Sequence, residues 1–494
     1  MTELKEHRIK QAHLYLLLFL IAFAFVFSSA YNPFNFRRGH VDSVTYTTIT
    51  QGISRGQLPY KDFVDNKGPL MYFLNVPGFI LGGFTGIWIT ELILMCTAVF
   101  FAYKTALFFC GKYKALLATA CSFAAALAFF TASAGTEEYS LPFLMIPLYI
   151  FTKYYFSTEQ ERNASICTLI VLGICFASAI SIRLDMFPLW AGFCTLIFFE
   201  TIIKRRFALL CKYILGFCAG IIVVLAPIFL YLKMNGIIDD FVYQVILGGA
   251  SRGFGGVNLK QTVINFYIAA SRNYSFIPLL WGVFSIIKNY PQKDFIFQAG
   301  YTFSYFIALL FFSFSGGDSH FNLSLIPFFV PPIAIFVKTL CCEFAIFQGG
   351  KRNLAIALFL CIVFSEGLMK CIDDFLEIFT NHSGGDLIRA GRMIDENTKY
   401  GDKIISLGSC YIYPFTQRPA ASKFINHGTG VNSYTGAREE FLNDVLQNKP
   451  AIIITFLAEN DDYLHAWYKP IYGMIERDYH TLDTIGDYVL FARN

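Results

Sequence analysis

An aspartate stands early in the first polar stretch of the chain, which runs from residue 31 to residue 86 directly after an apolar segment. Asp42, in the sequence HVDS, has a carboxylate that could take a proton from a hydroxyl group at a lipid surface, as a general base does. It could also be the N-cap of a helix over 43 to 54, because aspartate accepts hydrogen bonds from free backbone N–H groups there. The two roles are compatible.

A lysine lies further along the same stretch, in PYKDFVDNKGPL at residues 59 to 70. Pro69 suits the first turn of a helix, so Lys67 is expected immediately before a helix N-terminus. An ammonium group and free N–H groups act together on a phosphate, which makes Lys67 a candidate ligand for a lipid phosphate. Generic contact with lipid headgroups is the alternative. Tyr60 and Asp65 are candidate substrate contacts.

Two further polar clusters lie between apolar segments. Glu137 and Glu138, in GTEEYS, form an acidic pair that could position a metal ion or a sugar, although solvation of a helix end explains either residue equally well. Arg183 and Asp185, in SIRLD, predict a local ion pair, with Arg183 as a second candidate phosphate ligand. His320 precedes a later helix, where histidine is more often structural than in contact with substrate.

The composition around these residues is typical of an integral membrane protein. Of 494 residues, 55% are hydrophobic and only 15% are charged, against about 25% charged residues in soluble domains. A bilayer core needs about 20 apolar residues per helix, and on that criterion the sequence predicts about eleven spans. They are 11 to 30, 87 to 108, 115 to 133, 138 to 156, 164 to 182, 186 to 203, 208 to 231, 274 to 289, 295 to 314, 321 to 341 and 353 to 371.

Charge bias predicts the topology. The basic residues before the first span favour a cytoplasmic N-terminus. The segment 69 to 85 is long enough to cross a membrane but holds Pro77 and three glycines. If this segment does not cross, the later lysine and arginine clusters all fall on the cytoplasmic side. We therefore predict that it lies in the outer interface or forms a shallow re-entrant piece, which places the polar segments named above on the outer side.

The C-terminal part has the composition of a soluble protein. We predict a transmembrane module over 1 to 375 and an α/β domain over 376 to 494, outside the cytoplasm. Helices are expected at 386 to 398, 437 to 448 and 461 to 475. Strands are expected at 403 to 409 and 451 to 456, around 481 to 483 and at 488 to 492.

Other function classes find little support. The net charge of +4 is too small for a nucleic-acid partner, and the chain has no GxSxG, HExxH or Walker motif. The glycines at 248 to 256 lack the flanking strand and helix that a nucleotide-binding loop needs. Within or near the spans stand Glu91, Lys104, Glu200 and Glu366, of which Glu366 is expected to be the most deeply placed.

In the order of these elements the chain resembles the GT-C superfamily of polytopic membrane glycosyltransferases. The resemblance rests on Asp42, PYKDFVDNKGPL, GTEEYSLP and HFNLSLIPFFVPP, and it covers most of the membrane part. Within that superfamily the chain looks closest to protein O-mannosyltransferases and to the aminoarabinose transferases that modify lipid A. PYKDFVDNKGPL is the most specific of these elements.

The resemblance implies inverting transfer of a sugar from a polyprenyl phosphate to an acceptor hydroxyl of an envelope lipid, glycan or protein. Asp42 corresponds to the family's base, and Lys67, helped by Arg183 or Arg252, would bind the donor phosphate. Glu137 or Glu138 would be the second acidic site. HVDS lacks the acid pair that many members carry in this loop, so dependence on a divalent metal stays open and no other cofactor is implied.

Two other classes remain open from the sequence. A transporter or flippase of lipid-linked saccharides would place ionisable groups near the membrane midplane on broken helices in paired halves, and here such groups are few. A non-catalytic envelope-assembly protein is the other alternative. In every case we expect an integral, multi-pass protein of a bacterial cytoplasmic membrane.

Overall fold

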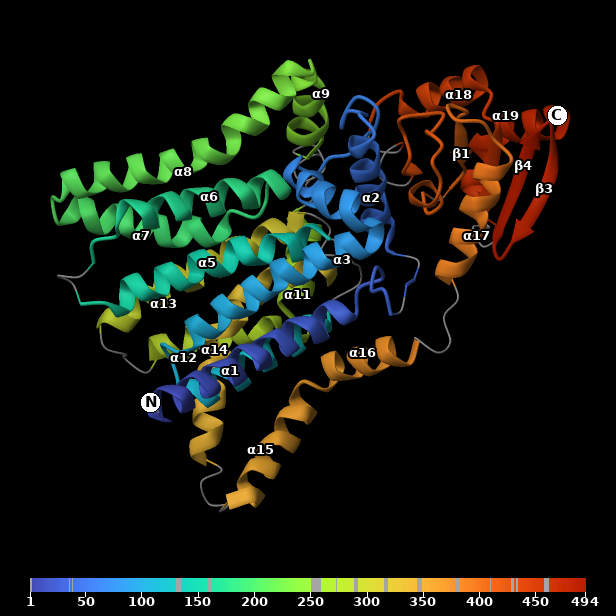
Figure 1. Ribbon diagram of the computed structural model, residues 1–494. Coiled ribbons are helices and arrows are strands. Elements are labelled where there is room, and N and C mark those ends of the chain that lie inside the picture. The colour runs from blue at the N-terminus through green and yellow to red at the C-terminus, as the bar shows by residue number, and fades with distance from the viewer. Residues whose placement is uncertain are drawn as a thin grey trace.

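The computed structural model describes residues 2 to 494 except 35, 38, 130–134, 159–161, 250–258, 272, 288–291, 315–318, 344–348, 378–382, 409, 428–430, 432–433 and 457–461. Most of its helices run side by side in one bundle, and a small unit with a β-sheet lies at one end of that bundle (Figure 1). A helical bundle with a C-terminal α/β unit is the architecture that the sequence predicts.

The bundle is built from helices of very different lengths. Its first half contains α1 (Thr2–Phe27), α2 (Val41–Ser54), α3 (Leu70–Ala106), α4 (Lys112–Leu127), α5 (Thr136–Phe156), α6 (Ile166–Ile182), α7 (Pro188–Ile203) and α8 (Phe207–Met234). Its second half contains α9 (Ile238–Phe241), the π-helix η2 (Val242–Leu247), α11 (Leu259–Ser271), η3 (Asn273–Ser275), α12 (Phe276–Ile287), α13 (Gln292–Phe314), η4 (Ser319–Leu325), α14 (Ile326–Glu343), α15 (Gly349–Val363) and α16 (Ser365–Leu376).

Several of these helices can cross a membrane. Among the described residues, four are long and apolar enough: α3, α8, Ile296–Phe314 in α13, and Phe321–Cys342 across η4 and α14. The pair α15 and α16, bent by 81° at its break, is a fifth candidate. The sequence count of about eleven included every apolar run, but some of these runs form shorter helices, such as α6 and α7.

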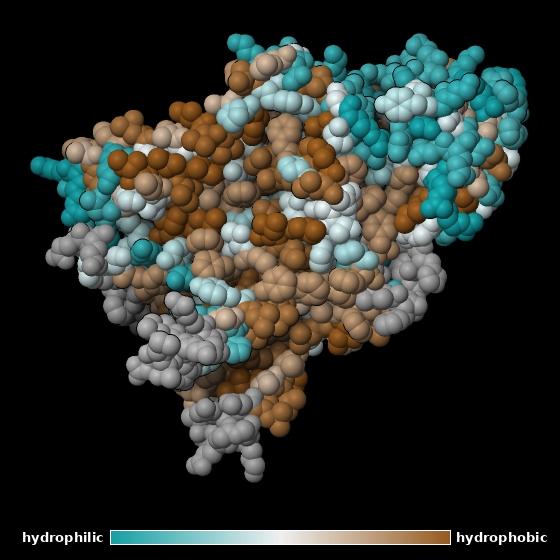
Figure 2. All heavy atoms as spheres, viewed as in Figure 1, coloured by the Kyte–Doolittle hydropathy of each residue, from teal (hydrophilic) through white to brown (hydrophobic). Residues whose placement is uncertain are grey.

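The surface of the bundle matches this assignment. In Figure 2 the bundle is predominantly hydrophobic, whereas hydrophilic residues gather over the C-terminal unit and at the far ends of α7 and α8. Large apolar side chains such as Leu81, Ile203 and Leu215 are well exposed on it. An apolar belt between two polar ends is what lipid-facing helices present to a bilayer.

The helix α3 is broken near its start. Gly82 and Gly83 leave the helical conformation, and Gly83 has a φ of 56°, which an L side chain rarely adopts. A Cβ on Gly86 would lie 1.8 Å from the carbonyl oxygen of Gly78, so the two limbs touch backbone to backbone. The first limb therefore folds back along the second. The interrupted helix predicted over 69 to 85 is present, and its place in the outer interface stays a prediction.

The C-terminal unit contains a mixed four-stranded sheet in the order β1-β2-β4-β3. β1 (Ile404–Ser406) pairs in parallel with β2 (Ile452–Phe456), and β4 (Tyr488–Arg493) pairs antiparallel with both β2 and β3 (Tyr479–Ile485). The central strand β2 reads IIITF, an apolar run suited to a strand covered on both faces. With α17 (Ser383–Glu396), the 3₁₀ turn η7 (Tyr413–Phe415), α18 (Ala437–Asn448) and α19 (Asp462–Asp478), every predicted element of this part is present.

The C-terminal unit is joined to the bundle through the first polar stretch. The N–H of Val64 donates to the carbonyl of Lys423 at 3.0 Å. Arg37 is buried and pairs with Asp374 of α16 at 3.0 Å and with Glu377. Because bundle and C-terminal residues also share one apolar core, the unit has a defined place at this end of the bundle.

Candidate active site

Asp42 lies in the first turn of α2. The N-cap of this helix is His40, whose ring nitrogen accepts from the N–H of Asp42 at 3.4 Å. The helix therefore begins two residues earlier than predicted, and Asp42 is not its cap. A carboxylate in the first turn is stabilised by the positive end of the helix dipole. The side chain is half-buried, so it stays within reach of a substrate.

Asp42 opens into a cleft between α2 and the start of α5. Counted out to its open mouth, this cleft has an empty volume of about 340 Å³. It is lined by His40, Asp42, Ser43, Tyr46, Phe129, Gly135, Thr136, Glu137, Glu138 and Leu323. Asp42 and the pair Glu137 and Glu138, far apart in the sequence, thus share one cavity, whereas Lys67, which was predicted to converge with them, is not among the described residues that line it.

Glu137, which lines the cleft, belongs to an ion-paired cluster centred on Arg183. Arg183, directly after α6, pairs with Glu137 and, at 2.8 Å, with Asp185. Its guanidinium also lies 4.1 Å from the centre of the Phe321 ring. Burial alone would lower the pKa of Arg183, but Asp185 and Glu137 raise it above its ordinary value. The local pair with Asp185 is confirmed, and two carboxylates already occupy the arginine that was a candidate phosphate ligand.

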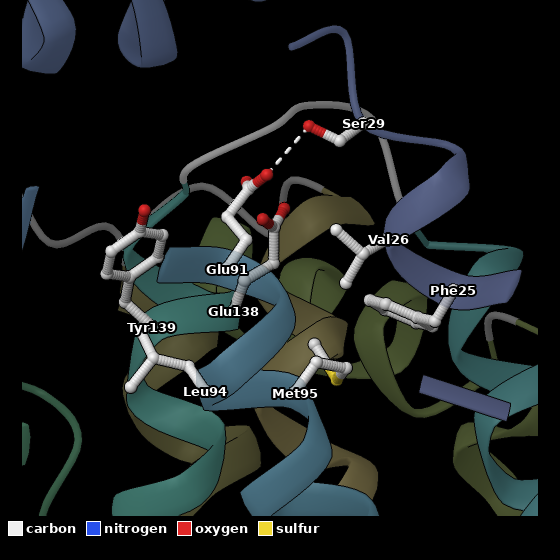
Figure 3. A pocket seen from close by; sticks show the side chains of 8 residues that line it. All are labelled: Phe25, Val26, Ser29, Glu91, Leu94, Met95, Glu138 and Tyr139. Atoms are coloured by element: carbon white, nitrogen blue, oxygen red, sulfur yellow. Dashed lines mark hydrogen bonds between the residues drawn. The ribbon is translucent and has the colours of Figure 1, made fainter. Parts of the chain in front are cut away.

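Glu138 behaves differently from its neighbour. It touches the cleft but also lines a second pocket with Glu91, Ser29 and apolar side chains from α1 and α3 (Figure 3). The hydroxyl of Ser29 donates to Glu91 at 2.8 Å, and the N–H of Gly135 donates to Glu138 at 3.3 Å. Both glutamates of the predicted acidic pair are buried, so solvation of a helix end explains neither of them.

The charges inside the bundle are not placed as the sequence suggested. Glu91 is only 4% exposed and lies against the start of α5, whereas Glu366 is on the exposed side of α16. The expectation that Glu366 is the most deeply placed was wrong, because its side chain lies on the exposed face of α16, whereas the neighbouring Gly367 packs against Ala124 of α4.

Lys67 lies before the N-terminus of α3, as predicted, and is half-buried. Among the described residues its ammonium group has no hydrogen-bond or ion-pair partner, so it is available to an anion. Asp65, two residues earlier, accepts from the hydroxyl of Tyr72 at 2.6 Å. Burial raises the pKa of Asp65, and the nearby charge of Asp42 raises it further, while Lys67 opposes this shift.

Tyr60 holds the loop together from within. Its φ is 67°, its hydroxyl donates to the carbonyl of Lys67 at 2.8 Å, and its own carbonyl accepts from Gln244 at 2.6 Å. It is 2% exposed and is not among the residues that line the cleft. In this structure the candidate substrate contact Tyr60 is therefore a support for Lys67.

The structure does not describe the side chains of two predicted site residues. Arg252 lies outside the described residues. His320 lies in η4, and its side chain is likewise outside the description, although the following residues Phe321 and Leu323 reach Arg183 and the cleft. A resident metal ion finds no support in the described part of the chain, where no group of three or more histidine, cysteine or acidic side chains is placed to hold one.

The sequence prediction missed Tyr46, which lies one helical turn after Asp42 and lines the same cleft. It also missed how the C-terminal unit holds α2. The hydroxyl of Thr45 lies 3.6 Å from the sulfur of Cys410 and accepts from Asn426 at 3.3 Å. The thiol of Cys410 donates to the carbonyl of Val41 at 3.5 Å. The turn that carries Asp42 is thus fixed from outside the bundle.

Of the comparisons with known proteins, only the comparison with solved structures finds similar proteins. No protein-family model and no curated protein sequence matches the chain. The structure of ArnT from Cupriavidus metallidurans in the apo state superposes with a TM-score of 0.60 at 12% identity, covering 98% of both chains. ArnT bound to undecaprenyl phosphate also gives 0.60, covering 97% of each.

A second relative in structure is the archaeal oligosaccharyltransferase AglB from Archaeoglobus fulgidus, in complex with an inhibitory peptide and a dolichol-phosphate. Its TM-score is 0.56 at 12% identity, with 98% of this chain and 74% of AglB covered. Over nearly its full length, the chain is therefore similar in structure to ArnT and AglB, which are GT-C membrane glycosyltransferases.

Proposed function

We propose that this protein is an inverting glycosyltransferase that moves one sugar from a polyprenyl-phosphate donor to an acceptor hydroxyl at the outer face of a membrane. The observation that carries the proposal is the cleft that Asp42 and Glu137 line together, with Glu137 paired to Arg183, within a fold similar to those of ArnT and AglB. The acceptor is an envelope lipid, glycan or protein.

Asp42 is the base in this proposal. Its carboxylate takes the proton of the acceptor hydroxyl while the acceptor oxygen forms a bond to the anomeric carbon. The bond between that carbon and the phosphate oxygen breaks, and its electron pair leaves with the polyprenyl phosphate. Attack on the face opposite the leaving group inverts the anomeric configuration. Because the phosphate leaves as an ionised group, no general acid is needed.

Lys67 binds the phosphate. Negative charge grows on the phosphate as the bond breaks, and a nearby ammonium group stabilises that charge. The free ammonium and the N-terminus of α3 behind it supply this stabilisation together. Arg252 remains a proposed helper, and Arg183 reaches the phosphate only if one of its two carboxylates releases it.

Glu137 serves as the second acidic site. With one carboxylate oxygen paired to Arg183 and the other accepting from the Thr136 hydroxyl at 3.0 Å, it is held in a fixed orientation on the cleft wall. A fixed carboxylate of this kind accepts hydrogen bonds from sugar hydroxyl groups. Glu138 lines the cleft as well as the second pocket, and in this proposal it supports the cleft wall.

The proposed topology follows the charge bias of the loops. The N-terminus is cytoplasmic, about eleven segments cross or enter the bilayer, and the domain over 376 to 494 lies outside, above the cleft. The module over 1 to 375 carries the catalytic groups. Undecaprenyl phosphate in ArnT and dolichol-phosphate in AglB support a polyprenyl phosphate as the donor lipid.

A transfer assay tests this function. Purified protein in vesicles receives undecaprenyl phosphate carrying a radiolabelled hexose or pentose, together with an extract of envelope lipids and glycans. We expect label to leave the donor and appear on an acceptor, with undecaprenyl phosphate as the second product. Label that changes leaflet while staying on its lipid would identify a flippase and refute the proposal.

Binding of the donor lipid tests Lys67. In Lys67→Met, affinity for undecaprenyl phosphate should fall about tenfold, because one charged contact of about 1.4 kcal/mol is lost. Lys61→Met is the matched control, since Lys61 lies in the same loop but is exposed. Equal affinity in the two variants would remove Lys67 from the phosphate site.

A further inference from the structure

The hydroxyl of Tyr46 is placed for contact with a bound molecule. Its side chain is only 2% exposed, and the residue lines the cleft that holds Asp42. Among the described residues this hydroxyl has no hydrogen-bond partner. Buried tyrosine hydroxyls usually have a hydrogen-bond partner, whereas the hydroxyl of Tyr46 opens to the cleft without one and is available to a bound molecule.

The surroundings of Tyr46 define what it can contact. Asp42, Asp65, Glu137 and Arg183 all act electrostatically on its phenol group, so it stands at the centre of the charged cluster. Burial, followed by the charge of Asp42, raises its pKa well above the ordinary value, and the phenol therefore stays protonated. It is a neutral donor among carboxylates that can only accept.

Packing fixes the direction of this donor. The ring of Tyr46 lies 6.3 Å from that of Tyr72, whose hydroxyl is committed to Asp65. The next residue on α2, Thr47, is held by Tyr31 at 2.8 Å. With the helix held on both sides, the Tyr46 ring cannot move far.

We propose, on the basis of the sugar transfer proposed above, that the Tyr46 hydroxyl donates a hydrogen bond to an oxygen atom of the donor sugar and so selects the sugar-bearing lipid. A sugar presents hydroxyl groups that donate to Asp42 and Glu137 and oxygen atoms that need a donor in return. Tyr46 supplies that donor without adding a charge. A phosphate would gain less from this position, because three carboxyl groups surround it.

Binding measurements on Tyr46→Phe test this role without requiring turnover. The probes are undecaprenyl phosphate alone and undecaprenyl phosphate carrying mannose, glucose, galactose or arabinose. We expect the wild-type protein to bind one of the sugar-bearing lipids more tightly than the bare lipid. In Tyr46→Phe the ratio of the two affinities should fall about tenfold, because one hydrogen bond of about 1.4 kcal/mol is removed. The affinity for undecaprenyl phosphate itself should stay unchanged.

Tyr31→Phe is the control, because it removes another buried tyrosine hydroxyl next to α2 outside the cleft. Its preference for the sugar-bearing lipid should equal that of the wild type. The inference is overturned if Tyr46→Phe keeps the full preference, if both affinities fall together, or if the wild type shows no preference. A preference that depends on Tyr46 in a protein that transfers no sugar would support the inference and refute the transferase.

Discussion

Glu137 and Glu138 follow one another in α5 and both line the cleft, yet only Glu138 also lines a second chamber. Glu137 shares the cleft with Asp42 and pairs with Arg183. Glu138 lies within hydrogen-bonding reach of Glu91 in the pocket behind, among side chains such as Phe25 and Met95 (Figure 3).

A glutamate side chain has different neighbours in the two chambers. Beside an arginine, a buried carboxyl group is ionised and fixed. No arginine or lysine is among the described residues that line the second pocket, so the two carboxyl groups there lack the cation that Glu137 has. The first chamber is therefore suited to binding and proton transfer, and the second to holding α1, α3 and α5 together.

Removing the cation of the first chamber should have the largest effect on stability. Arg183→Met leaves the buried Glu137 and the half-buried Asp185 without this positive partner, and the loss of one member of a buried pair costs about 3–5 kcal/mol. Thermal unfolding in detergent measures this loss. Arg389→Met is the control, because Arg389 is exposed and 3.9 Å from its acidic partner. Similar stabilities for both variants would contradict a buried ionic cluster.

Glutamine substitutions at Glu137 and at Glu138 test the difference between the two chambers. Glu137→Gln removes the charge that Arg183 requires and should cost about 2 kcal/mol of unfolding free energy. Glu138→Gln replaces a carboxyl group that has no arginine or lysine beside it among the described residues of the second pocket, so its cost should stay below about 1 kcal/mol. The reverse order of the two costs would mean that the chambers have been assigned the wrong chemistry.

His427, in the C-terminal unit, tests the effect of burial away from both chambers. Burial lowers the pKa of His427 to about 3, and the groups beside its ring are the hydroxyl of Tyr468 and the N–H of Gly408. The folded protein keeps this ring neutral, whereas the unfolded chain binds a proton below about pH 6.5. Its contribution to stability is thus complete above that pH and is lost as the pH falls from about 6.5 towards 3.

Between pH 7 and pH 6 this loss should amount to about 0.7 kcal/mol, the smallest of these effects. The measurement is the difference in unfolding free energy between the two pH values, compared for the wild type and His427→Asn. His480→Asn, at an exposed histidine, should behave like the wild type. An unchanged pH dependence in His427→Asn would show that this ring takes up a proton in the folded state.

The fold and the charged residues of the candidate site were largely predictable. Apolar runs against a polar background revealed the bundle, and short apolar runs bounded by turn residues predicted the central strands of the C-terminal unit. Asp42, Lys67 and Glu137 stood out because charged residues are rare here and are retained beside a membrane for function or pairing.

The division between the two chambers was not predictable. Neighbouring residues on a helix point about 100° apart, so Glu137 and Glu138 separate only once the packing of α5 is known. Tyr46 was missed because it is one of 28 tyrosines, and only the unpaired hydroxyl in the cleft distinguishes it. The position of Glu366 depends on which face of α16 packs against α4, which composition does not reveal.

The most direct test of the account is sugar transfer by Asp42→Asn, measured with labelled undecaprenyl-phosphate sugar in vesicles. Transfer should fall by a factor of about 10²–10⁴, the usual contribution of a general base, while binding of the donor lipid persists. Asp62→Asn, in the same loop but bonded to the N–H of Leu58 at 2.6 Å, should retain transfer. Full transfer by Asp42→Asn would contradict the assignment of the base and the mechanism built on it.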